Sequence, residues 1–226
     1  MANHRIFPHG APVELAAGLW QVEGSLPFPL KRNMTVVRRA DGALVVISAV
    51  ALDEAGMKGL EALGEPSVLV VSHPMHIMDV AFYKARYPQM RVVASKDAAA
   101  RLSDVRVDGS PEEVLPELGI RHHVVPGMKH TEVVLDVDIE KGRALVFTDL
   151  VGFGRGEGLL MKLLGPPGGV GVARIVKFRQ IASKPEVRAF LSRMAERNDL
   201  ALVLTGHGPP ALVEAAEKLR VAAEGL

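Results

Sequence analysis

Residues 67–72 form the segment that most restricts how this chain can fold. Val68, Leu69, Val70 and Val71 are consecutive apolar residues, and all but one of them are β-branched. A strand that carries apolar side chains on both faces must be covered on both faces, which is typical of central strands in α/β proteins. The segment therefore predicts a strand buried on both sides.

Two short turn sequences predict β-hairpins, one in each half of the chain. Asp41-Gly42 joins the β-rich runs 34–39 and 43–48, and residues 140–142 join the runs 132–139 and 143–149. Glycine readily adopts the positive φ that such turns need, so both are good hairpin signals. We expect two antiparallel pairs at these positions.

The remaining pattern of predicted strands and helices completes an α/β arrangement. We expect a single domain, residues 1–226, because no shift in composition marks a domain boundary. Residues 175–181 fit either a strand or a helix start, and the glycine-rich segment 152–171 is expected to be a loop or lid. Helix 74–87 is expected to begin with Pro74 in its first turn and to end before Pro88. Further strands are expected at 19–23, 91–95, 120–125 and 201–204, and further helices at 53–63, 96–102, 185–198 and 210–224.

Composition excludes several classes of function. Lys plus Arg minus Asp plus Glu is 27 − 26 = +1, so no bulk charge attracts the chain to nucleic acid or to a membrane. The chain has no cysteine, which excludes disulfides, thiolate metal sites and a cysteine nucleophile. No apolar run approaches the roughly 20 residues that span a bilayer. We expect a cytoplasmic protein that acts on a small molecule, with its oligomeric state left open.

Histidine or carboxylate side chains directly follow four of the predicted strands. Loops at strand ends are where a rigid sheet presents functional groups. Imidazole and carboxylate together form a ligand set for zinc, iron or manganese. The four segments are 70–79 with His73, His76 and Asp79, 126–131 with His130, 146–150 with Asp149, and 204–209 with His207.

This succession resembles the metallo-β-lactamase superfamily, whose motifs are His-x-His-x-Asp-His, a later His, a bridging Asp and a final Gly-His-Gly. Gly206-His207-Gly208 is the closest match, Asp149 stands at the position of the bridging Asp, and His130 matches the middle His. The resemblance covers nearly the whole chain. It implies a four-layer αββα sandwich with the metal site at one edge, between the sheets.

The first motif departs from the family pattern. If His73 takes the first position, Met75, Ile77 and Met78 stand where the family has its other three ligands. A shifted alignment uses His76 and Asp79 instead, because residues 73, 76 and 79 would share one face of a helix. In either alignment the chain resembles a divergent branch with an incomplete site.

The resemblance implies a hydrolase that uses a metal-activated water on an ester, amide or phosphoester. His73, His76, Asp79, His130, Asp149 and His207 are the candidate metal ligands, and Asp149 and His207 the candidate catalytic residues. Zinc is the first candidate, with iron and manganese as alternatives. The alternative function is a non-catalytic binding protein on the same fold, which requires no metal. A nucleic-acid-processing hydrolase is a weaker third option.

Other polar residues have simpler interpretations. His122 and His123 are adjacent on a strand and must face opposite ways, so ordinary core and solvent partners are expected. His4 and His9 are expected on a mobile N-terminal segment. Three cations are candidates for contact with a substrate, namely Lys129 and, in the glycine-rich segment, Arg155 and Lys162.

Overall fold

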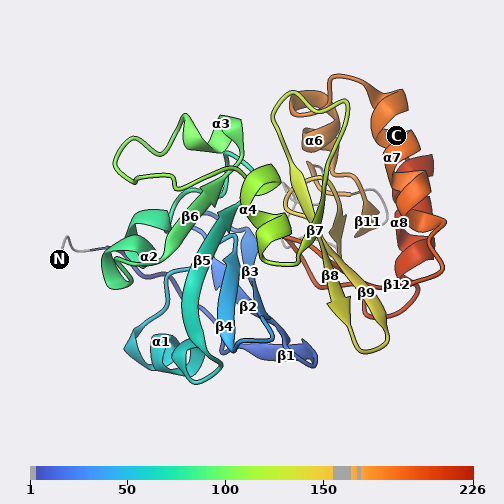
Figure 1. Cartoon of the computed structure of the whole chain (residues 1–226). Coiled ribbons are helices and arrows are strands. Elements are labelled where there is room, and N and C mark those ends of the chain that lie inside the picture. The colour runs from blue at the N-terminus through green and yellow to red at the C-terminus, as the bar shows by residue number, and fades with distance from the viewer. Residues whose placement is uncertain (1–3, 155–163, 167–168) are drawn as a thin grey trace. The chain divides into compact units, whose positions relative to one another are not determined.

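The computed structural model (Figure 1) describes residues 4–154, 164–166 and 169–226. The chain divides into two compact units, Met1–Gly119 (unit 1) and Ile120–Leu226 (unit 2). Each unit has its own sheet and its own apolar core. Within the described residues, no helix has the length and apolar character needed to cross a bilayer.

Unit 1 is built on a six-stranded sheet in the order β1-β2-β3-β4-β5-β6. The strands β1 to β4 pair antiparallel in sequence order, and β4, β5 and β6 pair parallel. Helix α1 connects β4 to β5, and α2 connects β5 to β6. The strands are β1 (Val13–Ala16), β2 (Leu19–Ser25), β3 (Lys31–Arg38), β4 (Ala43–Ile47), β5 (Glu65–Val71) and β6 (Arg91–Ala94), and the helices are α1 (Glu54–Glu61), α2 (Val80–Arg86), α3 (Lys96–Ala99) and α4 (Pro111–Glu117).

Several predictions for unit 1 are confirmed. The turn at Asp41-Gly42 joins the antiparallel strands β3 and β4, and Gly42 has a φ of +85°. Residues 68–71 of β5 are all buried, as a strand covered on both faces requires. Helix α1 begins after Asp53, whose side chain accepts a hydrogen bond from the Gly56 amide at 2.7 Å. This cap fixes the helix start.

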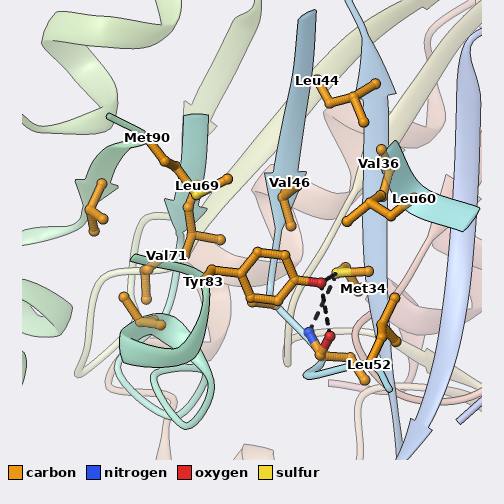
Figure 2. Packing of buried hydrophobic residues seen from close by; sticks show 14 of the residues in the cluster. Met34, Val36, Leu44, Val46, Leu52, Leu60, Leu69, Val71, Tyr83 and Met90 are labelled. Atoms are coloured by element: carbon orange, nitrogen blue, oxygen red, sulfur yellow. Dashed lines mark hydrogen bonds between the residues drawn. The ribbon is translucent and has the colours of Figure 1, made fainter. Parts of the chain in front are cut away.

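A buried tyrosine lies at the centre of the core of unit 1 (Figure 2). Tyr83 of α2 is fully buried, and its hydroxyl donates to the carbonyl oxygen of Val50 at 2.9 Å and lies 3.2 Å from Met34 Sδ. Burial raises the pKa of Tyr83 well above its usual value of 10. The hydroxyl therefore stays protonated and serves as a donor that ties α2 to the segment after β4.

Unit 2 contains a four-stranded sheet in the order β12-β9-β8-β7 and a two-stranded antiparallel ribbon, β10 with β11. Strands β7, β8 and β9 pair antiparallel, and β12 pairs parallel with β9. Helices α7 and α8 pack side by side (Figure 1). The strands are β7 (Arg121–Val124), β8 (Val133–Ile139), β9 (Gly142–Val146), β10 (Gly152–Phe153), β11 (Val170–Gly171) and β12 (Leu200–Leu204), and the helices are α6 (Arg174–Arg179), α7 (Lys184–Ala195) and α8 (Ala215–Glu224).

The hairpin predicted at residues 140–142 is confirmed as the β8–β9 connection, and Gly142 has a φ of +125°. The open question at 175–181 is decided in favour of a helix, α6. The glycine-rich segment is not wholly a loop, because β10 and β11 lie within it and pair with each other. Arg155 and Lys162 lie outside the described residues.

The predicted helix 74–87 begins six residues too early. Helix α2 begins at Val80, and the residues before it form two successive turns, with the His76 amide bonded to the His73 carbonyl and the Val80 amide bonded to the Ile77 carbonyl. Pro74 satisfies the rule for a first helical turn, but here it begins an isolated turn. The expectation that His73, His76 and Asp79 share one face of a helix is therefore wrong, because residues 73–79 are not helical.

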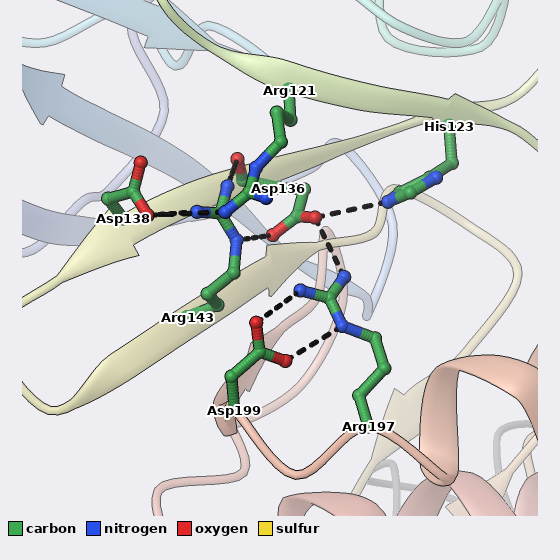
Figure 3. Close-up of polar contacts among 7 residues, drawn as sticks. All are labelled: Arg121, His123, Asp136, Asp138, Arg143, Arg197 and Asp199. Carbon is green, nitrogen blue, oxygen red and sulfur yellow. Dashed lines mark hydrogen bonds and ion pairs between the residues drawn. The ribbon is translucent and has the colours of Figure 1, made fainter.

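A network of charged side chains crosses the sheet of unit 2 (Figure 3). Asp136 of β8 is 2% exposed and accepts hydrogen bonds from Arg143 of β9, from His123 of β7 at 3.1 Å and from Arg197 at 2.7 Å. Arg143 also pairs with Asp138, and Arg197 with Asp199. The expectation of an ordinary partner for His123 is confirmed.

Asp136 should contribute strongly to stability. Burial raises the pKa of Asp136, but the hydrogen bonds from His123 and Arg197 outweigh it, so the pKa lies below its usual value of 3.8. We predict that Asp136→Asn lowers the free energy of unfolding by about 3 kcal/mol at pH 7, because Arg143 keeps a buried charge without this partner. Urea denaturation of both proteins measures the difference.

The pH dependence follows from the direction of the pKa shift. A carboxylate with a lowered folded-state pKa contributes stability that is complete above its unfolded-state pKa and is lost as the pH falls through the folded-state pKa. The difference in the free energy of unfolding between wild type and Asp136→Asn should therefore become smaller below about pH 4. Asp138→Asn is the matched control, since this carboxylate is 76% exposed and should contribute at most about 1 kcal/mol. Equal effects of the two substitutions at pH 7 would contradict the prediction.

Candidate functional site

The parallel pairing of β9 with β12 brings two of the predicted site residues together. Leu204, the last residue of β12, pairs with Val146, the last residue of β9. Hydrogen bonds continue beyond the strands, from the Phe147 amide to the Leu204 carbonyl at 2.9 Å and from the Gly206 amide to the Thr148 carbonyl at 3.0 Å. The segments that follow the two strands therefore run beside each other toward Asp149 and His207.

Asp149 and His207 form a carboxylate–imidazole pair. His207 Nε2 lies 3.1 Å from Asp149 Oδ1, and the two side chains are 26% and 8% exposed. The pair is thus enclosed by protein on most sides and still open to solvent at the imidazole. Such a pair can bind a cation or can orient and accept a proton from a water molecule.

The backbone around His207 is held independently of this pair. The Thr205 hydroxyl donates to the His207 carbonyl oxygen at 2.8 Å. Gly208 has a φ of +85°, and a Cβ there would lie 2.0 Å from the carbonyl oxygen of Phe153. Only glycine fits this approach of two backbone segments, which explains the second glycine of Gly206-His207-Gly208.

A buried glutamate holds the turn that carries Asp149. Glu132 is fully buried, and its Oε1 accepts backbone hydrogen bonds from Thr148 at 2.9 Å and from Asp149 and Leu150 at 3.2 Å each. From the sequence, Glu132 is expected only as the first residue of the predicted strand 132–139. A glutamate at the edge of an apolar strand is a usable signal, since a fully buried glutamate is rare unless paired.

In unit 1, the segment after β5 carries His73 and His76. His73 is fully buried, and its Nδ1 accepts a hydrogen bond from the Met75 amide at 3.4 Å. His76 is partly exposed, and its ring centroid lies 6.4 Å from that of His73. The first motif therefore presents two neighbouring imidazoles, while Met75, at 63% exposure, points into solvent.

Asp79 has a structural environment within unit 1. Both of its oxygens are engaged: Oδ2 accepts from Arg32 and from the Ala51 amide at 2.7 Å, and Oδ1 accepts from His4 at 2.8 Å. The residue is 1% exposed. Its carboxylate thus holds the N-terminal segment and β3 together.

The expectation that His4 and His9 lie on a mobile segment is wrong. His4 binds Asp79, and His9 Nε2 accepts a hydrogen bond from the Asp53 amide at 2.9 Å. These contacts attach the N-terminal segment to the start of α1 and of α2. A mobile terminus was expected because nothing in the sequence indicates partners so far along the chain.

The other predicted residues of unit 2 lie in more open positions. His130 is exposed on the connection between β7 and β8. Lys129 is also exposed, and its Nζ donates to the Phe178 carbonyl at 3.3 Å. Neither shares a described contact with the Asp149–His207 pair.

The chain matches no protein-family model, and no curated protein sequence is similar to it. Solved structures do match over nearly the whole chain. A structure of the DIM-1 metallo-β-lactamase exposed to ceftazidime is 14% identical with a TM-score of 0.67, covering 97% of this chain and 99% of that one. A metallo-β-lactamase from Erythrobacter litoralis is 17% identical with a TM-score of 0.61, covering 100% and 97%. The mono-zinc form of FIM-1 from Pseudomonas aeruginosa is 12% identical with a TM-score of 0.65, covering 97% and 96%.

We predict that Gly208→Ala destabilises the protein more than Gly42→Ala. Both glycines have a φ of +85°, so both substitutions incur the left-handed backbone cost of about 1–2 kcal/mol. A Cβ at Gly42 meets no atom within 4 Å, whereas at Gly208 it would collide with the Phe153 carbonyl. Urea denaturation should show an additional loss of about 1–3 kcal/mol for Gly208→Ala. Equal losses would mean that the two backbone segments do not approach each other as described.

Proposed function

We propose that this chain is a divergent member of the metallo-β-lactamase superfamily and a metal-dependent hydrolase with one strongly held metal ion. The chain has the fold of the metallo-β-lactamases, which confirms the predicted α/β, metallo-β-lactamase-like fold class and the resemblance at the level of the fold. The observation that carries this proposal is the 3.1 Å pairing of Asp149 with His207 at the carboxyl ends of two parallel strands. In an α/β sheet this edge is where ligands and catalytic groups are usually presented.

The donor set fits a borderline metal ion. One imidazole nitrogen and one carboxylate oxygen, on backbone segments fixed by their own hydrogen bonds, are suitable ligands for zinc, with iron and manganese as alternatives. His73 and His76 stay candidate ligands on the basis of the motif. We favour His76 over His73. The Met75 amide donates a hydrogen bond to His73 Nδ1, so the neutral His73 ring carries its proton on Nε2, and a protonated nitrogen does not bind a metal ion.

The remaining predicted ligands are weaker candidates. We leave Asp79 out, since Arg32, His4 and Ala51 already engage both of its oxygens. His130 remains a candidate on the basis of the motif. With Met75, Ile77 and Met78 at three positions of the family motif, few ligands remain for a second ion. The mono-zinc form solved for FIM-1 offers a precedent for one ion on this fold.

The chemistry follows from this donor set. A divalent cation with an open coordination position supplies Lewis acidity and activates water near neutral pH. Asp149 would hold or orient the attacking water, and His207 would help to hold the ion beside it. Lys129 or Arg155 would stabilise a negative leaving group. The substrate class is a small-molecule ester, amide or phosphoester, hydrolysed without a covalent intermediate, and we propose a cytoplasmic location.

The second candidate is a non-catalytic binding protein on the same fold. The observation that favours it is the loss of ligands from the first motif, together with the engagement of Asp79 by Arg32. In this case the Asp149–His207 pair would serve as a polar anchor for a small molecule.

We predict that His207→Ala removes bound metal and hydrolytic activity together and leaves the fold intact. The imidazole is 26% exposed at a strand end and contributes little to the core. Metal content after metal-replete expression, measured by mass spectrometry, and an ester and phosphoester screen test the prediction. Circular dichroism tests the fold.

His122→Ala is the matched control, because His122 is a partly exposed histidine of the same sheet and no part of the proposed site. It should keep both metal and activity. The same assay on His73→Ala and His76→Ala decides which histidine of the first motif contributes. Two metals per chain at full occupancy would contradict the one-metal proposal. A metal-free wild type with an unchanged His207→Ala variant would favour the binding protein.

A further inference from the structure

We propose that Glu132 is a positioning residue that sets Asp149 against His207. One of its two carboxylate oxygens, Oε1, accepts hydrogen bonds from the backbone amides of three successive residues, 148–150. The inference rests on the proposed function, because it concerns the same pair of residues. Glu132 binds the backbone of the turn, and we propose that it acts on Asp149 through that backbone.

The three amides form a concave donor site of the kind that binds anions. Successive backbone N–H groups in a tight turn converge on one point and attract negative charge. In this protein the anion is the chain's own carboxylate, which arrives from the residue immediately before β8. Charge-assisted hydrogen bonds to backbone N–H groups are shorter and stronger than neutral ones.

Backbone hydrogen bonds hold the segment that leads into the turn. Beyond β9, the Phe147 amide bonds to the Leu204 carbonyl, and the Gly206 amide bonds to the Thr148 carbonyl. The amides of residues 148–150 all point to Glu132 instead of a neighbouring strand. A change in the acceptor at Glu132 would therefore reorient the backbone that carries Asp149.

The location of the glutamate supports a specific role. Burial of a carboxylate is costly, and a fully buried glutamate is retained only where hydrogen bonds compensate for the lost water. An apolar residue at 132 would remove this acceptor from three amides, two of them buried, so the glutamate and the turn conformation depend on each other. The turn conformation in turn places the Asp149 carboxylate 3.1 Å from His207.

Three variants separate positioning from general stability. Glu132→Ala removes the acceptor, and Glu132→Gln keeps an acceptor oxygen of nearly the same reach. Asp136→Asn is the control for destabilisation, since Asp136 is also buried in unit 2 and belongs to the separate network of Arg143 and Arg197. Zinc affinity is measured by chelator competition at a temperature where all four proteins are folded.

We expect Glu132→Ala to weaken zinc binding by about 10–100-fold, the usual effect of losing a partner that orients a metal ligand. Glu132→Gln should lose less than Glu132→Ala, and Asp136→Asn should bind zinc like wild type. Unchanged affinity in Glu132→Ala, equal losses in Glu132→Ala and Glu132→Gln, or an equal loss in Asp136→Asn would overturn the inference. In all of these cases wild type still binds zinc, and the proposed function stands.

A crystal structure of Glu132→Ala tests the inference independently of metal. We expect the turn at 148–150 to move and the Asp149 carboxylate to leave hydrogen-bond distance of His207. An unmoved pair would overturn the inference. If wild type binds no zinc, the proposed function fails, and this structure still decides whether Glu132 positions Asp149.

Discussion

The parallel pairing of β12 with β9 is the constraint on which the candidate site depends. Parallel strands end at the same edge of a sheet, so residues at equal offsets beyond their ends become neighbours. Val146 and Leu204 pair as the last residues of their strands, and Asp149 and His207 both lie three residues further on. An antiparallel pairing of the same two strands would place these residues at opposite edges. The chemistry of the site is therefore a consequence of strand direction.

Three buried carboxylates show how the choice of partner decides what such a group can do. Asp136 binds Arg143, Arg197 and His123, and Asp79 binds Arg32 and His4, so cations of the protein neutralise both. Glu132 receives backbone amides, which balance its charge with dipoles and fix a turn. A carboxylate that already pairs with a guanidinium is a poor ligand for a metal ion, because the ion would have to displace a charged partner. Asp149 contacts an imidazole, whereas Asp79 and Asp136 contact guanidinium groups.

The sequence predicts strands, hairpins and strand-end residues well, because these depend on local pattern. Asp41-Gly42 and the turn at 140–142 give the hairpins, and the apolar run 68–71 gives a buried strand. The meeting of Asp149 and His207 follows once both are placed at strand ends. Two of the failures involve contacts over long sequence separations. Helix α2 begins only after Asp79, whose carboxylate is bound by Arg32 and the Ala51 amide, and His4 is held by the same carboxylate. Helix α4 was missed although Ser110 and Glu113 form a capping box, a local signal that was available.

The same reasoning bears on the choice between a metal-dependent enzyme and a metal-free binding protein. The Asp149–His207 contact is not needed to hold either segment, because Thr205 and Gly208 fix the backbone at His207 while Glu132 fixes the turn at Asp149. Each side chain of the pair is positioned by its own backbone segment. A cation could therefore replace the direct contact between the two side chains without a change in the fold. Preorganisation of this kind lowers the free energy that a bound ion must supply to order its ligands. The independent support of the two backbone segments is thus a premise of the metal site that we propose.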